Sequence, residues 1–326
     1  MYKFLSFLLC FAAAPWIAFA QVCGTNDLTE SFTDEEATYL ADRIAPHPFS
    51  EGLIWQANKR DERVVVVGTL HIPDARFDPI VARLTPTIEA SDLLIVEATR
   101  EVEASMASMA ATNPEMFFLT TGPSLIDLLE DAEWEQLSAE MSDRGIPGVL
   151  AAKFQPWYAS LVLAMPTCAL GALQAGQQGL DRRLETVAEQ AGVAVAGLEG
   201  AEAVLGVFAG DTIEDQLEGL RITLGTQDPT NASTSTLVEL YFDERTRASW
   251  EVSRILIDRE GIEGGQEMFD EVEQSLLIDR NMAWERVMSE LLPGKNVVLA
   301  VGAAHLSGET GVLRALERAG YEVTPF

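Results

Sequence analysis

The stretch VVVVGTLH, residues 64–71, is the clearest indication of the fold class in the sequence. Four consecutive valines with no polar residue between them predict a strand that is covered on both faces, as in a parallel sheet between two layers of helices. Gly68 then lets the chain turn sharply, and His71 follows three residues later. The whole chain has three histidines. We therefore ask which ligand or residue His71 contacts at the end of this strand.

The residues after His71 continue in a β-α-β pattern. Residues 77–90 predict a helix with Asp78 as N-cap and Pro79 at the first helical position, and residues 91–100 predict a second buried strand. Two further pairs of a helix followed by a strand are predicted later in the chain, and a last helix and a last strand follow them. These later elements are expected at residues 179–192, 193–200, 276–294, 296–305, 307–320 and 321–326. The predicted fold class is α/β, with a mixed, largely parallel central sheet.

The remaining segments have little strand signal. Residues 101–178 and 201–279 predict consecutive helices, which we expect to be insertions that cap the sheet. Residues 21–60 predict an N-terminal segment with one short helix that begins near Thr33. Since no internal repeat or low-complexity tract is present, residues 21–326 are predicted to form a single domain.

Residues 1–20 have the layout of a secretory signal peptide, with a lysine near the start, a long apolar stretch and Ala-Phe-Ala before Gln21. The protein is therefore expected to be exported, to the periplasm or the extracellular space. The alternative is an uncleaved membrane anchor, because the apolar stretch is long enough to span a bilayer. No other segment has the roughly 18 consecutive apolar residues of a second crossing, so no membrane span is expected after cleavage.

Two cysteines, Cys23 and Cys168, remain once Cys10 has left with the signal peptide. In an oxidising compartment, an even pair is typical of a disulfide. Such a bond would tie the new N-terminus to the body of the protein. Two free thiols are the alternative.

The charge balance limits the class of partner. The chain of 326 residues carries 51 acidic and 22 basic side chains, which give a formal net charge of −29. This charge opposes counterion-driven binding to nucleic acid or to an anionic membrane. We therefore expect no nucleic-acid partner, and the 48% hydrophobic content predicts a folded core.

Four residues that can coordinate or titrate follow the ends of predicted strands. They are His71, Glu97, Glu199 and His305. In an open α/β sheet the carboxyl ends of the strands form the ligand crevice, so these side chains are expected to converge. The two histidines share one frame, GTLH and GAAH, in which Gly68 and Gly302 would let the chain approach a substrate closely.

The converging set predicts a metal site. Two histidines and a carboxylate that leave open positions are a common catalytic arrangement for a divalent ion. Glu97 is the preferred carboxylate, since an acid after an apolar strand is costly unless it is paired or coordinating. Glu199 is the expected general base. For each histidine alone, a buried and hydrogen-bonded core residue is the alternative.

Three further residues are candidates for the site. Arg280 would orient a carboxylate or stabilise an oxyanion, with a surface salt bridge as the alternative, and Asn281 is a neighbouring polar candidate for substrate binding. Trp157 would form a substrate wall or pack in the core. His47, beside two prolines, is expected to be structural. Motifs of zincins, nucleophile elbows and phosphate-binding loops are absent from the sequence.

The sequence resembles the TraB/GumN family, which includes the TIKI metalloproteases. The similar stretches are VVVVGTLH, LLIVEA, GLDRRLETVAEQAGVAVAGLEG, DRNMAWERV and the C-terminal VVLAVGAAHLSGETGVLRALERAGYEV. The resemblance implies a fold like that of erythromycin esterase and the ChaN haem-binding lipoproteins. It also implies an active site with His71, Glu97, Arg280 and His305. In the TIKI branch the activity is proteolysis that depends on manganese or cobalt.

Together, the residues and the resemblance predict an exported metal-dependent hydrolase, peptidase-like, that acts on a peptide or another small substrate. Manganese or cobalt is the favoured ion, and zinc is the alternative. A metal would lower the pKa of a bound water and polarise the scissile carbonyl. The alternative function is a non-catalytic envelope protein that binds a metal, haem or a saccharide and is linked to polysaccharide production.

Overall fold

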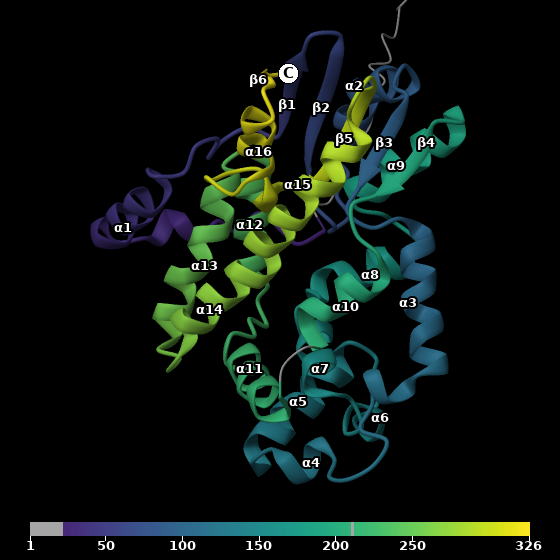
Figure 1. Ribbon diagram of the computed structural model, residues 1–326. Helices are drawn as coiled ribbons and strands as arrows, with labels where there is room; N and C mark the ends of the chain where they lie inside the picture. The colour runs from purple at the N-terminus through teal and green to yellow at the C-terminus, as the bar shows by residue number, and fades with distance from the viewer. Residues whose placement is uncertain (1–21, 210–211) are drawn as a thin grey trace, which may run out of the picture.

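The computed structural model describes residues 22–209 and 212–326, so the predicted signal peptide lies outside the described residues. A six-stranded sheet with the order β4-β3-β5-β2-β1-β6 forms the centre (Figure 1). Neighbours from β4 to β2 are parallel, whereas β1 is antiparallel to β2 and β6. The predicted α/β class is confirmed. The strands are β1 Ile54–Lys59, β2 Glu62–Thr69, β3 Leu93–Val96, β4 Ala194–Gly197, β5 Asn296–Gly302 and β6 Glu322–Pro325.

The valine strand β2 lies inside the sheet and is covered on both faces, as predicted. Val64, Val65, Val66 and Val67 are each at most 1% exposed. β2 pairs in register with β5, so that Val64 lies opposite Val297. Because successive side chains point to opposite faces, the four valines supply both sides of the core.

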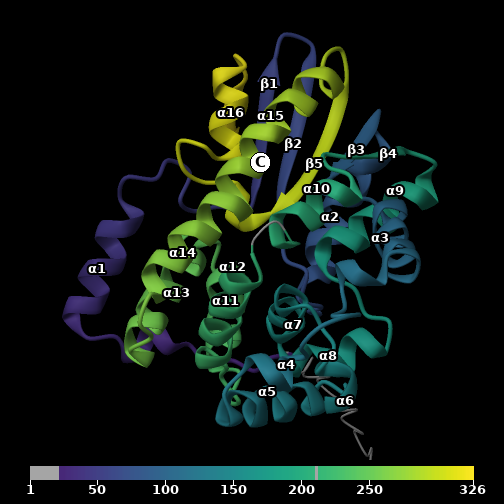
Figure 2. The ribbon, with the colours of Figure 1, turned by 60° about the horizontal axis from the view of Figure 1, so that its bottom comes forward.

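Two layers of helices cover the sheet. On one face, Val65 and Val67 pack with α2 (Phe77–Glu89) and α9 (Leu180–Ala191). On the other face, Val64 and Val66 pack with α15 (Arg280–Leu291) and α16 (Val312–Arg318). Figure 2 shows α15 along this second face. The β-α-β units read from the sequence therefore form a three-layer core.

The N-terminal segment contains a strand that the sequence did not reveal. Residues 21–60 were expected to hold one short helix, but they hold η1 (Leu28–Ser31), α1 (Asp34–Ile44) and the strand β1. The expected helix start is confirmed, since Thr33 and Glu36 form a capping box. β1 escapes detection because Ala57 is its one buried residue. Its hairpin turn through Arg60 also lacks the usual Asn-Gly or Asp-Gly signal.

The expected start of α2 is corrected. Asp78 was expected to be the N-cap, but the helix begins at Phe77, with Arg76 at the cap position. The carboxylate of Asp74 accepts the backbone N–H of Arg76 at 2.8 Å. This local bond forms a turn that leads directly into the helix, so the helix starts earlier than expected. Asp78 instead accepts a hydrogen bond from Arg183, at 2.6 Å.

The two predicted insertions are helical and lie beyond one end of the sheet (Figures 1 and 2). They pack on each other, because Leu217 and Leu220 of the second belong to the apolar cluster of the first. The elements of the first are α3 Arg100–Thr112, η2 Pro114–Met116, α4 Leu125–Leu128, α5 Asp131–Asp143, α6 Gly148–Ala151, α7 Pro156–Leu163 and α8 Thr167–Gln174. Those of the second are α10 Ala201–Ala209, α11 Ile213–Gly225, α12 Ala232–Phe242, α13 Thr246–Glu260, α14 Gly265–Glu273 and the π-helical η3 Gln274–Asp279.

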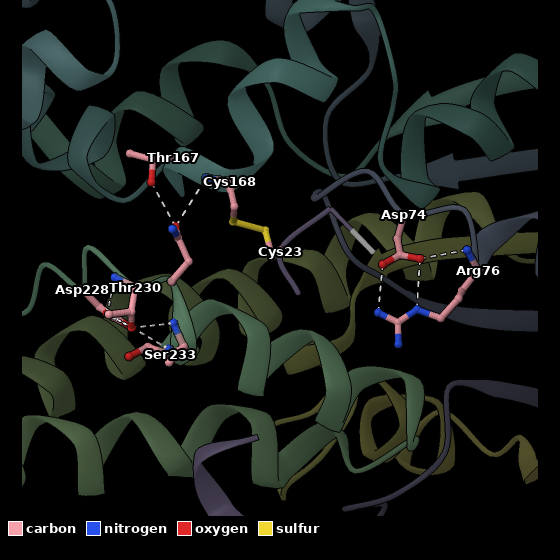
Figure 3. Close-up of a disulfide and its surroundings, with 10 residues drawn as sticks. Cys23, Asp74, Arg76, Thr167, Cys168, Asp228, Thr230 and Ser233 are labelled. Atoms are coloured by element: carbon pink, nitrogen blue, oxygen red, sulfur yellow. Dashed lines mark hydrogen bonds and ion pairs between the residues drawn. A yellow bond between two sulfur atoms is a disulfide. The ribbon is translucent and has the colours of Figure 1, made fainter. Parts of the chain in front are cut away.

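A disulfide joins Cys23 to Cys168 and so ties the first described residues to α8 (Figure 3). Of the two alternatives left open by the sequence, the structure has the paired one. Among the described residues, no single helix is long and apolar enough to cross a membrane. α7 and α8 pass that test as a pair, with a bend of 84° between them.

Candidate active site

The predicted site residues come together at the carboxyl edge of the sheet. β2, β3, β4 and β5 are parallel, and they end at Thr69, Val96, Gly197 and Gly302. The residues beyond these ends meet in one cavity of about 480 Å³. Its lining includes His71, Glu97, Glu199, Arg280, Gly302 and His305.

Arg280 binds three of these residues at once. It is the first residue of α15, directly after the π-helical η3. Its Nε donates to Glu199 Oε2 at 3.1 Å, and its Nη2 donates to Glu97 Oε2 at 2.7 Å and to Glu199 Oε1. Its Nη1 lies 3.3 Å from Leu276 O and 3.2 Å from His305 Nε2. All five N–H groups are thus used, which favours a role in holding Glu97 over direct contact with an oxyanion.

Glu97 is a largely buried carboxylate, 14% exposed, with both oxygens engaged. Besides the Arg280 contact, Glu97 Oε1 accepts the backbone N–H of Gly302 at 2.6 Å. Burial alone would raise the pKa of Glu97, but the basic side chains around it, led by His305 and Arg280, lower it to about 2. Gly302 leaves room for this contact, since a Cβ atom there would lie 3.1 Å from Glu97 Oε1 and would make the carboxylate shift by a few tenths of an ångström.

His305 is buried and neutral at neutral pH. Its side chain is 5% exposed, and its ring stacks on Trp284 at 4.4 Å between centroids. Burial lowers its pKa to about 4, and the nearby Arg280 adds to this effect. Its Nδ1 lies 2.8 Å from Asn281 Oδ1, which assigns the proton to Nδ1. The lone pair of Nε2 then accepts from Arg280.

His71 is held by the start of α9. The backbone N–H of Leu180 donates to Leu70 O at 3.0 Å. Gly179 packs so closely that a Cβ atom there would lie 2.5 Å from His71 O. Asp181 Oδ1 then lies 3.1 Å from His71 Nδ1. The turn after the valine strand is therefore fixed by backbone and side-chain contacts.

The environment of His71 favours its protonated form, unlike that of His305. Desolvation alone would lower the pKa of His71, but the carboxylates of Asp181 and Glu97 outweigh it and raise the pKa to about 9. The side chain is 67% exposed, so solvent screens part of this effect. One cavity therefore contains one histidine that holds its proton and one that stays neutral.

Three predicted substrate contacts do not line the cavity. Gly68 lies directly behind it, packed on Ala303 and Leu306. Asn281 contacts His305 instead. Trp157 is 5% exposed and packs with Phe117 in a separate cluster of the first insertion. His47, expected to be structural, lies against Gly308, where burial lowers its pKa.

The predicted metal ligands are close to one another, but their arrangement does not fit an ion. In the described part of the chain, no group of three His, Cys, Asp or Glu residues has the spacing of a metal site. His305 Nε2 lies 3.9 Å from Glu97 Oε1, with the Arg280 guanidinium in contact with both residues. A divalent ion between them would meet the positive charge of Arg280. The metal stays a prediction.

The model of the TraB/PrgY/gumN family matches residues 53–325. The chain belongs to the TraB/PrgY/gumN family. The matched range begins just before β1 and contains every residue of the cavity. No curated protein matches the chain. Membership of the TraB/PrgY/gumN family confirms the resemblance seen in the sequence, whereas the reaction has to be argued from the site.

Two residues of this TraB/PrgY/gumN site were missed by the sequence analysis. Asp181 contacts His71, and Trp284 donates its indole N–H to Glu199 Oε2 at 3.3 Å. An acid in the first turn of a helix is explained by the helix dipole alone, which is why Asp181 drew no attention. Gly179, a glycine that allows tight packing, stands two residues before the carboxylate of Asp181. This spacing is the sequence signal that could have indicated Asp181.

Proposed function

We propose that this protein is an exported hydrolase that cleaves an amide or ester bond at the carboxyl edge of its sheet. The observation that carries the proposal is the pair of histidines in one cavity: His305 Nδ1 is hydrogen-bonded to Asn281, and His71 Nδ1 forms an ion pair with Asp181 Oδ1 at 3.1 Å. Held in this way, each ring directs its chemistry through Nε2. Opposite protonation preferences within one site are typical of an acid and base pair.

In the proposed reaction, His305 is the general base. A water molecule takes the place of the Arg280 donor at Nε2 and gives its proton to that atom while its oxygen attacks the carbonyl carbon. The resulting imidazolium lies near Glu97, whose carboxylate stabilises the new charge. Arg280 and Glu199 hold this carboxylate in place. Glu199 acts in this scheme by binding Arg280, in place of the general-base role expected from the sequence.

His71 is the proposed general acid. As the bond between the carbonyl carbon and the leaving nitrogen or oxygen breaks, the imidazolium of His71 gives its proton to the leaving group. Asp181 keeps the ring oriented during the transfer. His305 then loses the proton that it gained, and His71 takes up a proton. The site is thereby restored. The sum is the addition of one water molecule across one bond.

Export is part of the proposal. It is supported by the signal-peptide layout of residues 1–20 and by the disulfide between Cys23 and Cys168, since such bonds persist in oxidising compartments. The periplasm or the extracellular space is the proposed location. A divalent ion, manganese, cobalt or zinc, stays a prediction.

The test is turnover of fluorogenic peptide and ester libraries by the mature protein, with EDTA or with each ion added. We expect His71→Ala and His305→Ala each to lower kcat/KM by roughly hundredfold or more. His47→Gln is the matched control, because this histidine lies outside the cavity. If no substrate is cleaved faster by the wild type than by the double His71→Ala, His305→Ala variant, the protein is not this hydrolase. Ligand binding without turnover would favour the non-catalytic envelope protein.

A further inference from the structure

The cavity has a second, apolar half that the proposed reaction does not use. Side chains from both helical insertions form it, and we call them the apolar wall. They are Met106 of α3, Val204 and Val207 of α10, Leu237 of α12, Trp250 of α13 and Leu276 of η3. His71, Glu97, Glu199 and His305 follow strand ends, whereas the wall comes from the insertions, so these groups and the wall belong to different parts of the chain.

We infer that the apolar wall binds a branched aliphatic or aromatic group next to the scissile bond. This inference rests on the proposed hydrolase function and names its substrate class. The wall and the catalytic groups line one continuous cavity, so a substrate whose carbonyl reaches His305 also places a neighbouring group on the wall. A leucine-like or phenylalanine-like side chain, or an acyl chain of similar size, meets this condition.

Two polar groups that line this side of the cavity are paired with the protein itself, whereas the indole N–H of Trp250 has no hydrogen-bond partner among the described residues. Arg182 Nη2 donates to Glu103 Oε1 at 2.5 Å, and Ser249 Oγ donates to Thr246 O at 2.7 Å. A hydroxyl group buried against the wall would lose its bonds to water and would find only this one donor in exchange. The wall therefore selects against saccharides and polar side chains and favours apolar ones.

The expected selectivity follows from the hydrophobic effect. Complete burial of a leucine-sized side chain corresponds to roughly a tenfold to hundredfold gain in affinity. We therefore expect N-acetyl-leucyl-leucine amide to bind at least about tenfold more tightly than N-acetyl-seryl-serine amide. A charge introduced on the wall should remove this preference, because a carboxylate in an apolar pocket keeps its water.

The experiment measures binding by calorimetry in a His71→Ala background, which prevents turnover of the probes. Removing this ring is structurally mild because its side chain is 67% exposed. Val207→Asp is added on the wall, and Ala203→Asp is the matched control on an exposed position of the same helix. Val207→Thr, with nearly the same shape, is a milder second variant. Thermal unfolding shows whether each variant is folded.

We expect the leucine probe to bind best, the preference to vanish in Val207→Asp, to shrink in Val207→Thr and to persist in Ala203→Asp. The inference is overturned if the serine probe or maltotriose binds as tightly as the leucine probe, if no peptide probe binds, or if haemin competes with a saturable shift of its Soret band. If the leucine probe binds as expected and the wild type cleaves no leucine ester or amide, the hydrolase proposal fails and the apolar preference stands.

Discussion

Asn281 holds the buried imidazole of His305 by its Nδ1 atom, at 2.8 Å from Asn281 Oδ1, and so directs Nε2 toward Arg280. The amide of Asn281 also donates to the backbone carbonyl of His305 at 3.4 Å. The two residues therefore fix each other's orientation. An active base at this position depends on a residue that does not itself line the cavity.

Replacing Asn281 tests this dependence. We expect Asn281→Leu to lower kcat about hundredfold or more, because the ring loses the acceptor that selects its tautomer. Asn281→Asp keeps an acceptor and should lose less activity. Steady-state kinetics and thermal unfolding are the measurements. Full activity in a folded Asn281→Leu protein would show that His305 does not act through this contact.

Gly179 is predicted to be irreplaceable for the position of His71. In Gly179→Ala the new Cβ would lie 2.5 Å from the backbone oxygen of His71, so the turn that carries the histidine must move. We expect a loss of activity of at least about tenfold. Gly219→Ala is the control, because a Cβ atom at this helical glycine meets nothing within 4 Å. Equal activity of the two variants would contradict the proposed packing.

The pH profile of kcat/KM should be broad. His305 must be neutral, so activity should rise as the pH increases through about 4. His71 must be protonated, so activity should fall as the pH increases through about 9. In Asp181→Asn the upper limb should move to lower pH, since the carboxylate supports the proton on His71. Two limbs near the ordinary pKa of histidine in the wild type would refute this assignment.

Arg280 is predicted to keep divalent ions out of the site. In Arg280→Met, Glu97 and Glu199 lose the positive charge between them, so manganese, cobalt and zinc should bind at least about tenfold more tightly than in the wild type. Calorimetric titration measures this, and Arg286→Met is the control, since this neighbouring arginine is 86% exposed. Tighter metal binding by the wild type than by Arg280→Met would instead support the metal-dependent mechanism.

The disulfide should make a large contribution to stability. Cys23 and Cys168 are separated by 145 residues, and in the chain-entropy model closure of such a loop stabilises the fold by about 4 to 5 kcal/mol. Urea unfolding of the double Cys23→Ser, Cys168→Ser variant should show this decrease. Dithiothreitol should lower the stability of the wild type to that of the variant and leave the variant unchanged. Unchanged stability of the wild type in dithiothreitol would count against a bond in the folded protein.

The layers of the fold could be predicted because the central strands are apolar throughout. Val64 to Val67 and Leu93 to Val96 have no polar face, which is the pattern of strands covered on both sides. β1 could not be predicted, because its burial depends on pairing with β2 and β6 and not on its own composition. Tertiary pairing decides its conformation.

Site residues could be predicted where the sequence contains a residue that destabilises the fold unless it is paired or coordinating. Glu97 stands directly after an apolar strand and Gly302 precedes a histidine, and both lie in the cavity. Asp181 has an ordinary explanation as a helix-start acid, so its contact with His71 is visible only in three dimensions. Trp157 was predicted to belong to the site but lies outside the cavity, because this buried aromatic side chain packs in an apolar cluster of the first insertion.

The place of β5 in the sheet has a consequence for the order in which the protein can assemble. β2 and β3 follow each other along the chain but are not neighbours, because β5 lies between them and pairs with both. A nascent polypeptide that has not yet produced residues 296–302 therefore lacks the middle of its sheet. These pairings join segments that are far apart in sequence, and such pairings form slowly in general. The polypeptide thus stays without an assembled site until almost all of it has been synthesised.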